Sequence, residues 1–86
     1  MSGKTRRALL ALYRIAGGRA GVMVPHESIA ADLGWSTADT VYHLATIPLA
    51  YAVDAFRGSS LTPAGAELAA DLSPPRRVGG RTTDRS

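Results

Sequence analysis

Hydroxyl and imidazole side chains gather in one short stretch of the chain, "WSTADTVYHLAT" at 35–46. A hydroxyl can donate and accept hydrogen bonds, the methyl group of threonine adds an apolar contact, and imidazole can donate to an acceptor. The side chains that could make such contacts with a partner are Ser36, Thr37, Thr40, Tyr42, His43 and Thr46, with the cation of Arg57 further along the chain. This chemistry predicts recognition of a partner by hydrogen bonds and methyl contacts.

The residues that could support catalysis do not form a reactive set. Ser28, Ser59 and Ser60 lack the partners of a nucleophilic triad, and the glycines fit no phosphate-cradling motif. His26 and His43 have no carboxylates at metal-ligand spacing, and the chain has no cysteine. We therefore expect no enzyme activity, no metal, no cofactor and no small-molecule ligand.

Apolar spacing and capping residues predict four helices. Their expected ranges are 5–16, 25–33, 37–46 and 63–72. Gly17 and Gly34 are expected to end the first two helices, because glycine tolerates the left-handed conformation of a helix C-terminus. Pro25 and Pro63 are expected at first helical positions, where a missing N–H costs no hydrogen bond.

The third of these helices, 37–46, carries most of the candidate contact residues. Ser36 followed by Asp39 imitates a capping box at its start. Its expected buried stripe is Val41, Leu44 and Ala45, which would leave Asp39, His43 and Thr46 facing outward. Trp35, directly after the turn glycine, is expected to pack under the turn.

Short strands are predicted between the helices. "GVMV" at 21–24 and "YAVD" at 51–54 are apolar and partly β-branched, and a return strand is expected at 60–61 after a turn around Gly58. The resulting order is helix, strand, helix, helix, strand, strand, helix. This order predicts an α+β fold that is mainly α with a small β-hairpin.

The charges divide the chain into two parts. The 86 residues carry a formal net charge of +3, but residues 1–73 hold equal numbers of basic and acidic side chains. All of the excess comes from the stretch 74–86, which contains almost no large apolar residue. We therefore expect one domain over 1–73 and a disordered basic tail over 74–86.

No membrane segment is predicted. The longest apolar run, "LATIPLAYAV", is too short to span a bilayer and contains Pro48. The start of the chain imitates a secretory signal only until Arg14 breaks its apolar region, so we interpret it as an amphipathic first helix. The lack of cysteine suits a reducing compartment, and we expect a cytoplasmic protein.

These features resemble the winged helix-turn-helix proteins among bacterial and phage transcriptional regulators. "HESIAADLGWSTADTVYHL" is similar to their helix-turn-helix, with small Ala30 at the helix crossing, Gly34 at the turn and apolar Val41 on the second helix. "LTPAGAELA" at 61–69 is similar to the segment after the wing in multiple-antibiotic-resistance-type regulators. The resemblance covers roughly residues 6–72 and implies a winged helix fold with the order α-β-α-α-β-β-α.

The resemblance also implies sequence-specific binding to double-stranded DNA, in a small transcriptional regulator. Helix 37–46 would enter the major groove with its polar side chains, and Arg57 on the short wing would reach the flanking backbone. That helix has no lysine or arginine, so we expect weak binding by a monomer. A homodimer, with Leu68 and Leu72 or the margin of the first helix at its interface, would double the contacts. The alternative is a winged-helix module that binds another protein without strong DNA binding.

Overall fold

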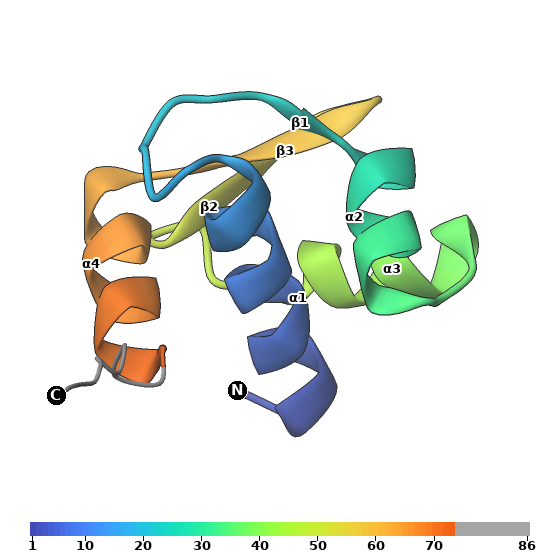
Figure 1. The fold of residues 1–86 in the computed structure, drawn as a ribbon, viewed down its shortest axis with the longest axis horizontal. Coiled ribbons are helices and arrows are strands. Elements are labelled where there is room, and N and C mark those ends of the chain that lie inside the picture. The colour runs from blue at the N-terminus through green and yellow to red at the C-terminus, as the bar shows by residue number, and fades with distance from the viewer. Residues whose placement is uncertain (74–86) are drawn as a thin grey trace, which may run out of the picture.

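The computed structural model describes residues 1–73, which form an α+β domain of four helices and a three-stranded antiparallel sheet (Figure 1). The elements are α1 (Gly3–Ile15), β1 (Val24–Pro25), α2 (His26–Leu33), α3 (Thr37–Ala45), β2 (Ala52–Asp54), β3 (Gly58–Leu61) and α4 (Pro63–Leu72). Their order agrees with the order predicted from the sequence. The predicted disordered tail, 74–86, lies outside the described residues.

Side-chain caps define most of the helix ends. Ser2 caps α1 by accepting a hydrogen bond from the backbone N–H of Thr5 at 3.1 Å, so the helix begins two residues before the predicted start. Thr62 caps α4 in the same way, with Pro63 at its first position as predicted. The prediction for Pro25 is wrong, because Pro25 is the last residue of β1 and has an extended backbone, so α2 begins at His26.

The sheet has the order β1-β3-β2, so β3 is its central strand. Asp54 pairs with Ser59 on one edge of β3, and Pro25 pairs with Gly58 on the other. The prediction that Gly58 lies in the turn is therefore wrong. Because two neighbours pair with it, β3 extends over four residues, and the turn of the β2–β3 hairpin shortens to residues 55–57.

Helix α1 is the centre of the domain. It lies between α4 on one side and the α2–α3 pair on the other (Figure 1). Leu9 and Leu12 of α1 are fully buried against core residues that include Ile29, Leu44 and Leu61. Since α2 and α3 cover only one flank of α1, the far side of α3 is left facing solvent.

Candidate functional site

Helix α3 presents one face to the core and the opposite face to solvent. Its buried stripe consists of Thr40 and Leu44, continued after the helix by Ile47. The exposed side chains come from Thr37, Ala38, Tyr42 and Ala45, and Val41 beside them is half-buried. The buried stripe is thus displaced by about one residue from the predicted one, and Val41 and Ala45 lie on the outer side.

The prediction that Thr40 contacts a partner is wrong. Thr40 is 0% exposed, and its hydroxyl donates to the carbonyl of Ser36 at 2.9 Å. Thr40 lies four residues before Leu44, so the helical period places the two side chains on the same face. The hydrogen bond to the carbonyl of the preceding turn satisfies the hydroxyl, which allows threonine to occupy a core position.

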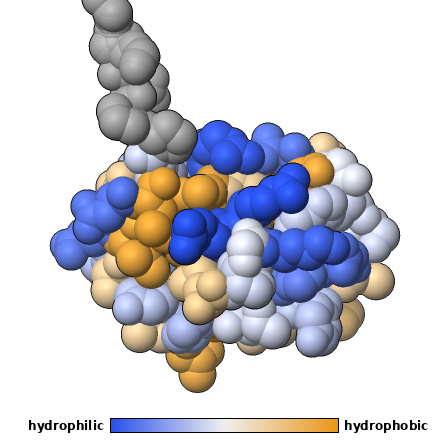
Figure 2. Space-filling model, turned by 90° about the horizontal axis from the view of Figure 1, so that it is seen from below, coloured by the Kyte–Doolittle hydropathy of each residue, from blue (hydrophilic) through white to orange (hydrophobic). Residues whose placement is uncertain are grey.

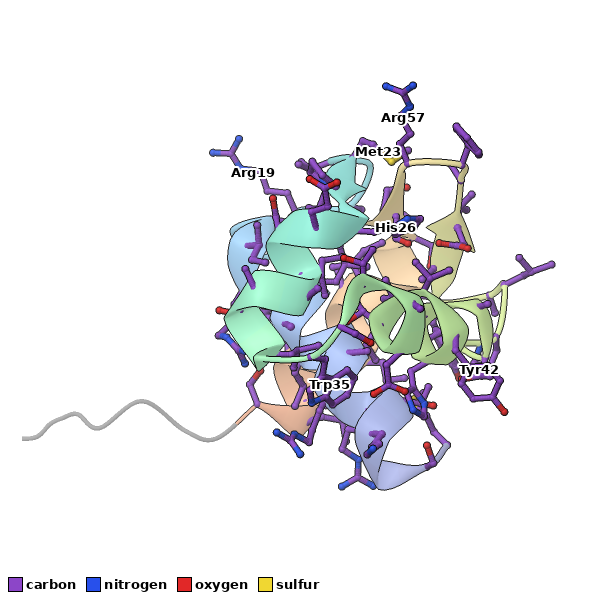
Figure 3. All side chains as sticks on the ribbon, turned by 90° about the vertical axis from the view of Figure 1, so that its right-hand side faces the viewer. Arg19, Met23, His26, Trp35, Tyr42 and Arg57 are labelled. Atoms are coloured by element: carbon purple, nitrogen blue, oxygen red, sulfur yellow. The ribbon has the colours of Figure 1, made fainter. Side chains whose placement is uncertain are left out.

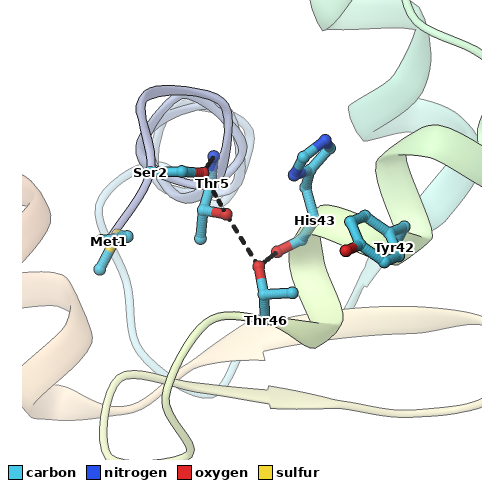
Figure 4. A pocket seen from close by; sticks show the side chains of 6 residues that line it. All are labelled: Met1, Ser2, Thr5, Tyr42, His43 and Thr46. Carbon is cyan, nitrogen blue, oxygen red and sulfur yellow. Dashed lines mark hydrogen bonds between the residues drawn. The ribbon is translucent and has the colours of Figure 1, made fainter.

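Two more of the predicted contact residues are turned toward α1. The hydroxyls of Ser2, Thr5 and Thr46 form a chain that ends on the carbonyl of His43, with the Thr5–Thr46 link at 2.8 Å (Figure 4). The ring of His43 is 14% exposed and lies 3.6 Å from the carboxylate of Asp39. The expectation that these residues face outward is therefore wrong for His43, whose ring is largely covered. Thr46 is exposed as expected, with its hydroxyl held toward α1, and the side chain of Asp39 is 42% exposed.

A cavity of about 370 Å³ opens beside this hydroxyl chain, between the start of α1 and the last turn of α3. Thr5 and Thr46 line it, together with Tyr42 and His43. The hydrogen atoms of the three hydroxyls are already donated along the chain, so the wall formed by Ser2, Thr5 and Thr46 offers a ligand no free donor.

Ser36, Thr37 and Tyr42 are exposed among the predicted residues, as are Thr46 and Arg57. The hydroxyl of Ser36 accepts from the backbone N–H of Asp39 at 3.1 Å, so it serves as the N-cap of α3. Thr37 is exposed, and Tyr42, at 65% exposure, points away from the domain (Figure 3). These two side chains are the polar groups that α3 offers to a partner.

A groove separates α3 from the tip of the β2–β3 hairpin. Its volume is about 630 Å³, and its walls come from the start of α2, the side of α3 and the hairpin turn. The residues lining it are Pro25, His26, Glu27, Thr37, Val41, Phe56 and Arg57. The guanidinium of Arg57 lies 5.7 Å from the ring centre of Phe56 and points away from the domain (Figure 3). Arg57 also lines the groove together with Thr37 and Val41 of α3, so the predicted cation lies across this groove from the helix.

The hairpin is fixed to α2 by a small polar cluster that sequence reasoning missed. His26 donates through Nε2 to the Asp54 carboxylate at 2.8 Å, and the hydroxyl of Ser59 donates to the same oxygen at 2.6 Å. His26 and Ser59 are buried. The backbone N–H of His26 also donates to the carbonyl of Arg57 at 3.0 Å, which fixes the position of the tip.

Replacing Asp54 with alanine is expected to lower the free energy of unfolding by about 2 kcal/mol, because it leaves two buried donors without their acceptor. Urea denaturation followed by the fluorescence of Trp35, the one tryptophan of the chain, measures this change. Asp71→Ala is the matched control, since Asp71 is an exposed carboxylate on α4. Equal midpoints for the two variants would contradict the anchoring role of Asp54.

A second group of cations lies on the opposite side of α3 from Arg57. Trp35 packs against the core, and Arg7 and Lys4 of α1 lie 5.4 and 5.8 Å from its ring centre. In Figure 3, α3 runs between Arg57 at the hairpin tip and Trp35 below it. The Lys4 ammonium is also 4.0 Å from the Asp39 carboxylate at the start of α3. Cations therefore flank the outer face of α3 on both sides.

Neither a group of metal ligands nor a helix able to span a membrane is found among the described residues. Within 1–73, no three His, Cys, Asp or Glu side chains come together as a metal would require. No helix in this part of the chain has the length and apolar character needed to cross a membrane. Comparison with protein-family models, with curated proteins and with solved structures gives no match for this chain. Functional inference therefore starts from the geometry around α3.

Proposed function

We propose that this chain is a winged helix-turn-helix protein that binds double-stranded DNA as a small transcriptional regulator in the cytoplasm. Three features support the winged helix. Gly34 ends α2 with φ +73°, and α3 follows after two residues with its own cap. The tip of the β2–β3 hairpin shares a groove with α3, as a wing would, and the hairpin is anchored to α2 through His26. Helices α2 and α3 contact each other, and the small Ala30 of α2 is buried, as the resemblance implies for a residue at the helix crossing.

The observation that carries the DNA proposal is the placement of cations on both sides of an exposed helix. An α-helix fits into the major groove of B-DNA, and a phosphate strand then runs along each side of it. Arg57 would meet one strand, and the cations of Lys4 and Arg7 would meet the other. Phosphate contacts supply most of the affinity of such complexes.

The neutral charge of residues 1–73 limits how strongly one copy can bind. We therefore include a homodimer, which would engage two half-sites, in the proposal. Apolar residues gather on the α4 side of the face seen from below (Figure 2). Leu68 and Leu72 of α4 are half-buried against the core and keep part of their surface free for a second copy. Light scattering of the full chain measures the oligomeric state.

The test is a titration of the full-length protein with a labelled mixed-sequence duplex at about 50 and about 200 mM salt. If the three cations beside α3 each neutralise one phosphate, the affinity is expected to fall about fortyfold over this range. The contribution of the tail is separated by a variant in which serine replaces its arginines, Arg76, Arg77, Arg81 and Arg85. If neither the natural chain nor this variant binds at about 50 mM salt, the proposal is contradicted.

One observation favours a second candidate function, the binding of another protein. Phe56 is 90% exposed, Leu49 is 79% exposed and Tyr42 is 65% exposed. Large apolar side chains at this exposure often mark interaction surfaces. Failure to bind DNA at low salt, together with an association in light scattering that Phe56→Ser abolishes, would favour this function.

A further inference from the structure

The outer face of α3 has few hydrogen-bonding groups that are free to read bases. Ser36 accepts from the backbone of Asp39, Thr40 donates to a carbonyl inside the core, and Thr46 belongs to the hydroxyl chain to α1. His43 is largely covered. Thr37 and Tyr42 are thus the polar side chains within α3 that are exposed and make no hydrogen bond to the residues that the structure describes.

Methyl groups make up most of the rest of the outer face of α3. Ala38, Val41 and Ala45 lie on the outer side of α3, and Thr37 adds its methyl group beside them. Val41 is half-buried and lines the groove, and it is not among the residues packed against the core, so the part of it that faces the groove is available to a partner. From Ala38 to Ala45 the helix rises about 10 Å, which is the length of about three base pairs.

We propose that this face selects A·T-rich DNA by contact with the C5-methyl groups of thymine, an inference that rests on the proposed function. In the major groove the four standard base pairs differ in one apolar group, the thymine methyl. Apolar side chains such as alanine and the methyl of threonine are the groups that recognise it. The cations flanking α3 hold the helix against the phosphates on either side, so its methyl-rich face is directed at the groove floor.

The outer face of α3 lacks the side chains that normally recognise guanine, so it offers no chemical basis for a preference for G·C pairs. Recognition of guanine normally uses a bidentate Arg or Lys, and recognition of adenine uses Asn or Gln. Helix α3, with the sequence TADTVYHLA, contains none of these four residue types. Its carboxylate, Asp39, lies near Lys4 and His43 on the side toward α1. Selectivity for A·T pairs therefore depends on methyl contacts.

The test compares two duplexes of the same length, one of alternating dA and dT and one in which deoxyuridine replaces every thymine. Deoxyuridine keeps the hydrogen-bonding groups of thymine and lacks its methyl. We expect the full-length protein to bind the thymine duplex more tightly, by about fourfold for one contacted methyl and about fiftyfold for three. Equal affinities for the two duplexes would overturn the assignment. Binding to neither duplex would overturn the proposed function and the thymine assignment with it.

A second pair of duplexes distinguishes recognition of the methyl group from recognition of the groove shape of A·T-rich DNA. Alternating dG and dC is compared with alternating dG and 5-methyl-dC, which carries a methyl group in the major groove. The methylated duplex is expected to bind about fourfold or more tighter. An unchanged affinity would show that the protein responds to groove shape, and it would overturn methyl recognition.

A matched pair of variants assigns the effect to α3. Val41→Ala removes two methyl groups from the outer face and is expected to reduce the thymine-to-deoxyuridine affinity ratio by about threefold or more. Val22→Ala removes the same groups from an exposed valine in the α1–β1 loop and should leave the ratio unchanged. A ratio that responds equally to both variants would exclude α3 as the reading surface.

Discussion

Replacing Gly65 with alanine is expected to lower the free energy of unfolding by about 3 kcal/mol, because a Cβ at this position would overlap the carbonyl of Tyr51. Gly65 lies in the first turn of α4 and is buried, while Tyr51 directly precedes β2. The overlapping atoms belong to the backbone, so a side-chain rotation cannot relieve the clash. Helix α4 would have to move away from the hairpin, and the residues of α1 that it covers would become exposed.

The matched control for this prediction is the same substitution in α1. A Cβ at Gly3 would meet no atom within 4 Å beyond its chain neighbours and its own helix backbone, so Gly3→Ala is expected to leave stability unchanged or to raise it by up to about 1 kcal/mol through helix propensity. Urea denaturation followed by Trp35 fluorescence compares both variants with the natural chain. A Gly65→Ala midpoint equal to that of the natural chain would show that α4 does not approach Tyr51 this closely.

Local signals in the sequence explain why the order of elements could be predicted. Thr62 with Pro63 marks the start of α4, and Ser36 marks the start of α3, because each cap acts on backbone groups within a few residues. Gly34 ends α2 through a left-handed conformation that few other residues adopt. The expectation for Pro25 failed because the pairing of β1 with β3, a partner over 30 residues away, decided its state.

The buried face of α3 was harder to predict, because the helical period was applied to apolar residues and one buried residue is polar. A pattern of apolar residues assigns Val41 to the core and Thr40 to the surface, yet the structure does the reverse for Thr40. A threonine hydroxyl can be satisfied by its own helix, so threonine fits either environment. The cluster of His26, Asp54 and Ser59 had no sequence signal, since His26 lies 28 residues before Asp54 and meets it only when the sheet forms.

These corrections change which residues the DNA hypothesis depends on. The sequence placed recognition on the hydroxyls and the imidazole of helix 37–46. The structure instead uses Ser36 as a cap, buries Thr40 in the core and holds the hydroxyl of Thr46 toward α1. What the structure leaves exposed is a methyl-rich face between two groups of cations. Affinity should then depend on Arg57, Arg7 and Lys4, and base preference should depend on the methyl groups of α3.

The largest expected effect on binding comes from removing the cations on both sides of α3 together. The double variant Arg7→Ala with Arg57→Ala is expected to bind a mixed-sequence duplex about a hundredfold more weakly, about tenfold for each lost phosphate contact. The slope of log affinity against log salt should become less steep by about 2. The loss should be similar for all sequences, because phosphate contacts do not distinguish bases.

The double variant Arg14→Ala with Arg19→Ala is the control. It shows whether affinity depends on where the cations lie or on the total charge. It lowers the net charge by the same amount, but Arg14 pairs with Asp32 of α2 and Arg19 points away from α3 (Figure 3). Fluorescence anisotropy with one duplex over the same salt range compares the two variants. Because the control keeps both cation groups beside α3, it is expected to retain most of the affinity and the salt slope of the natural chain. Equal losses from the two variants would mean that DNA is attracted by total charge, and that α3 and its flanking cations do not form the binding surface.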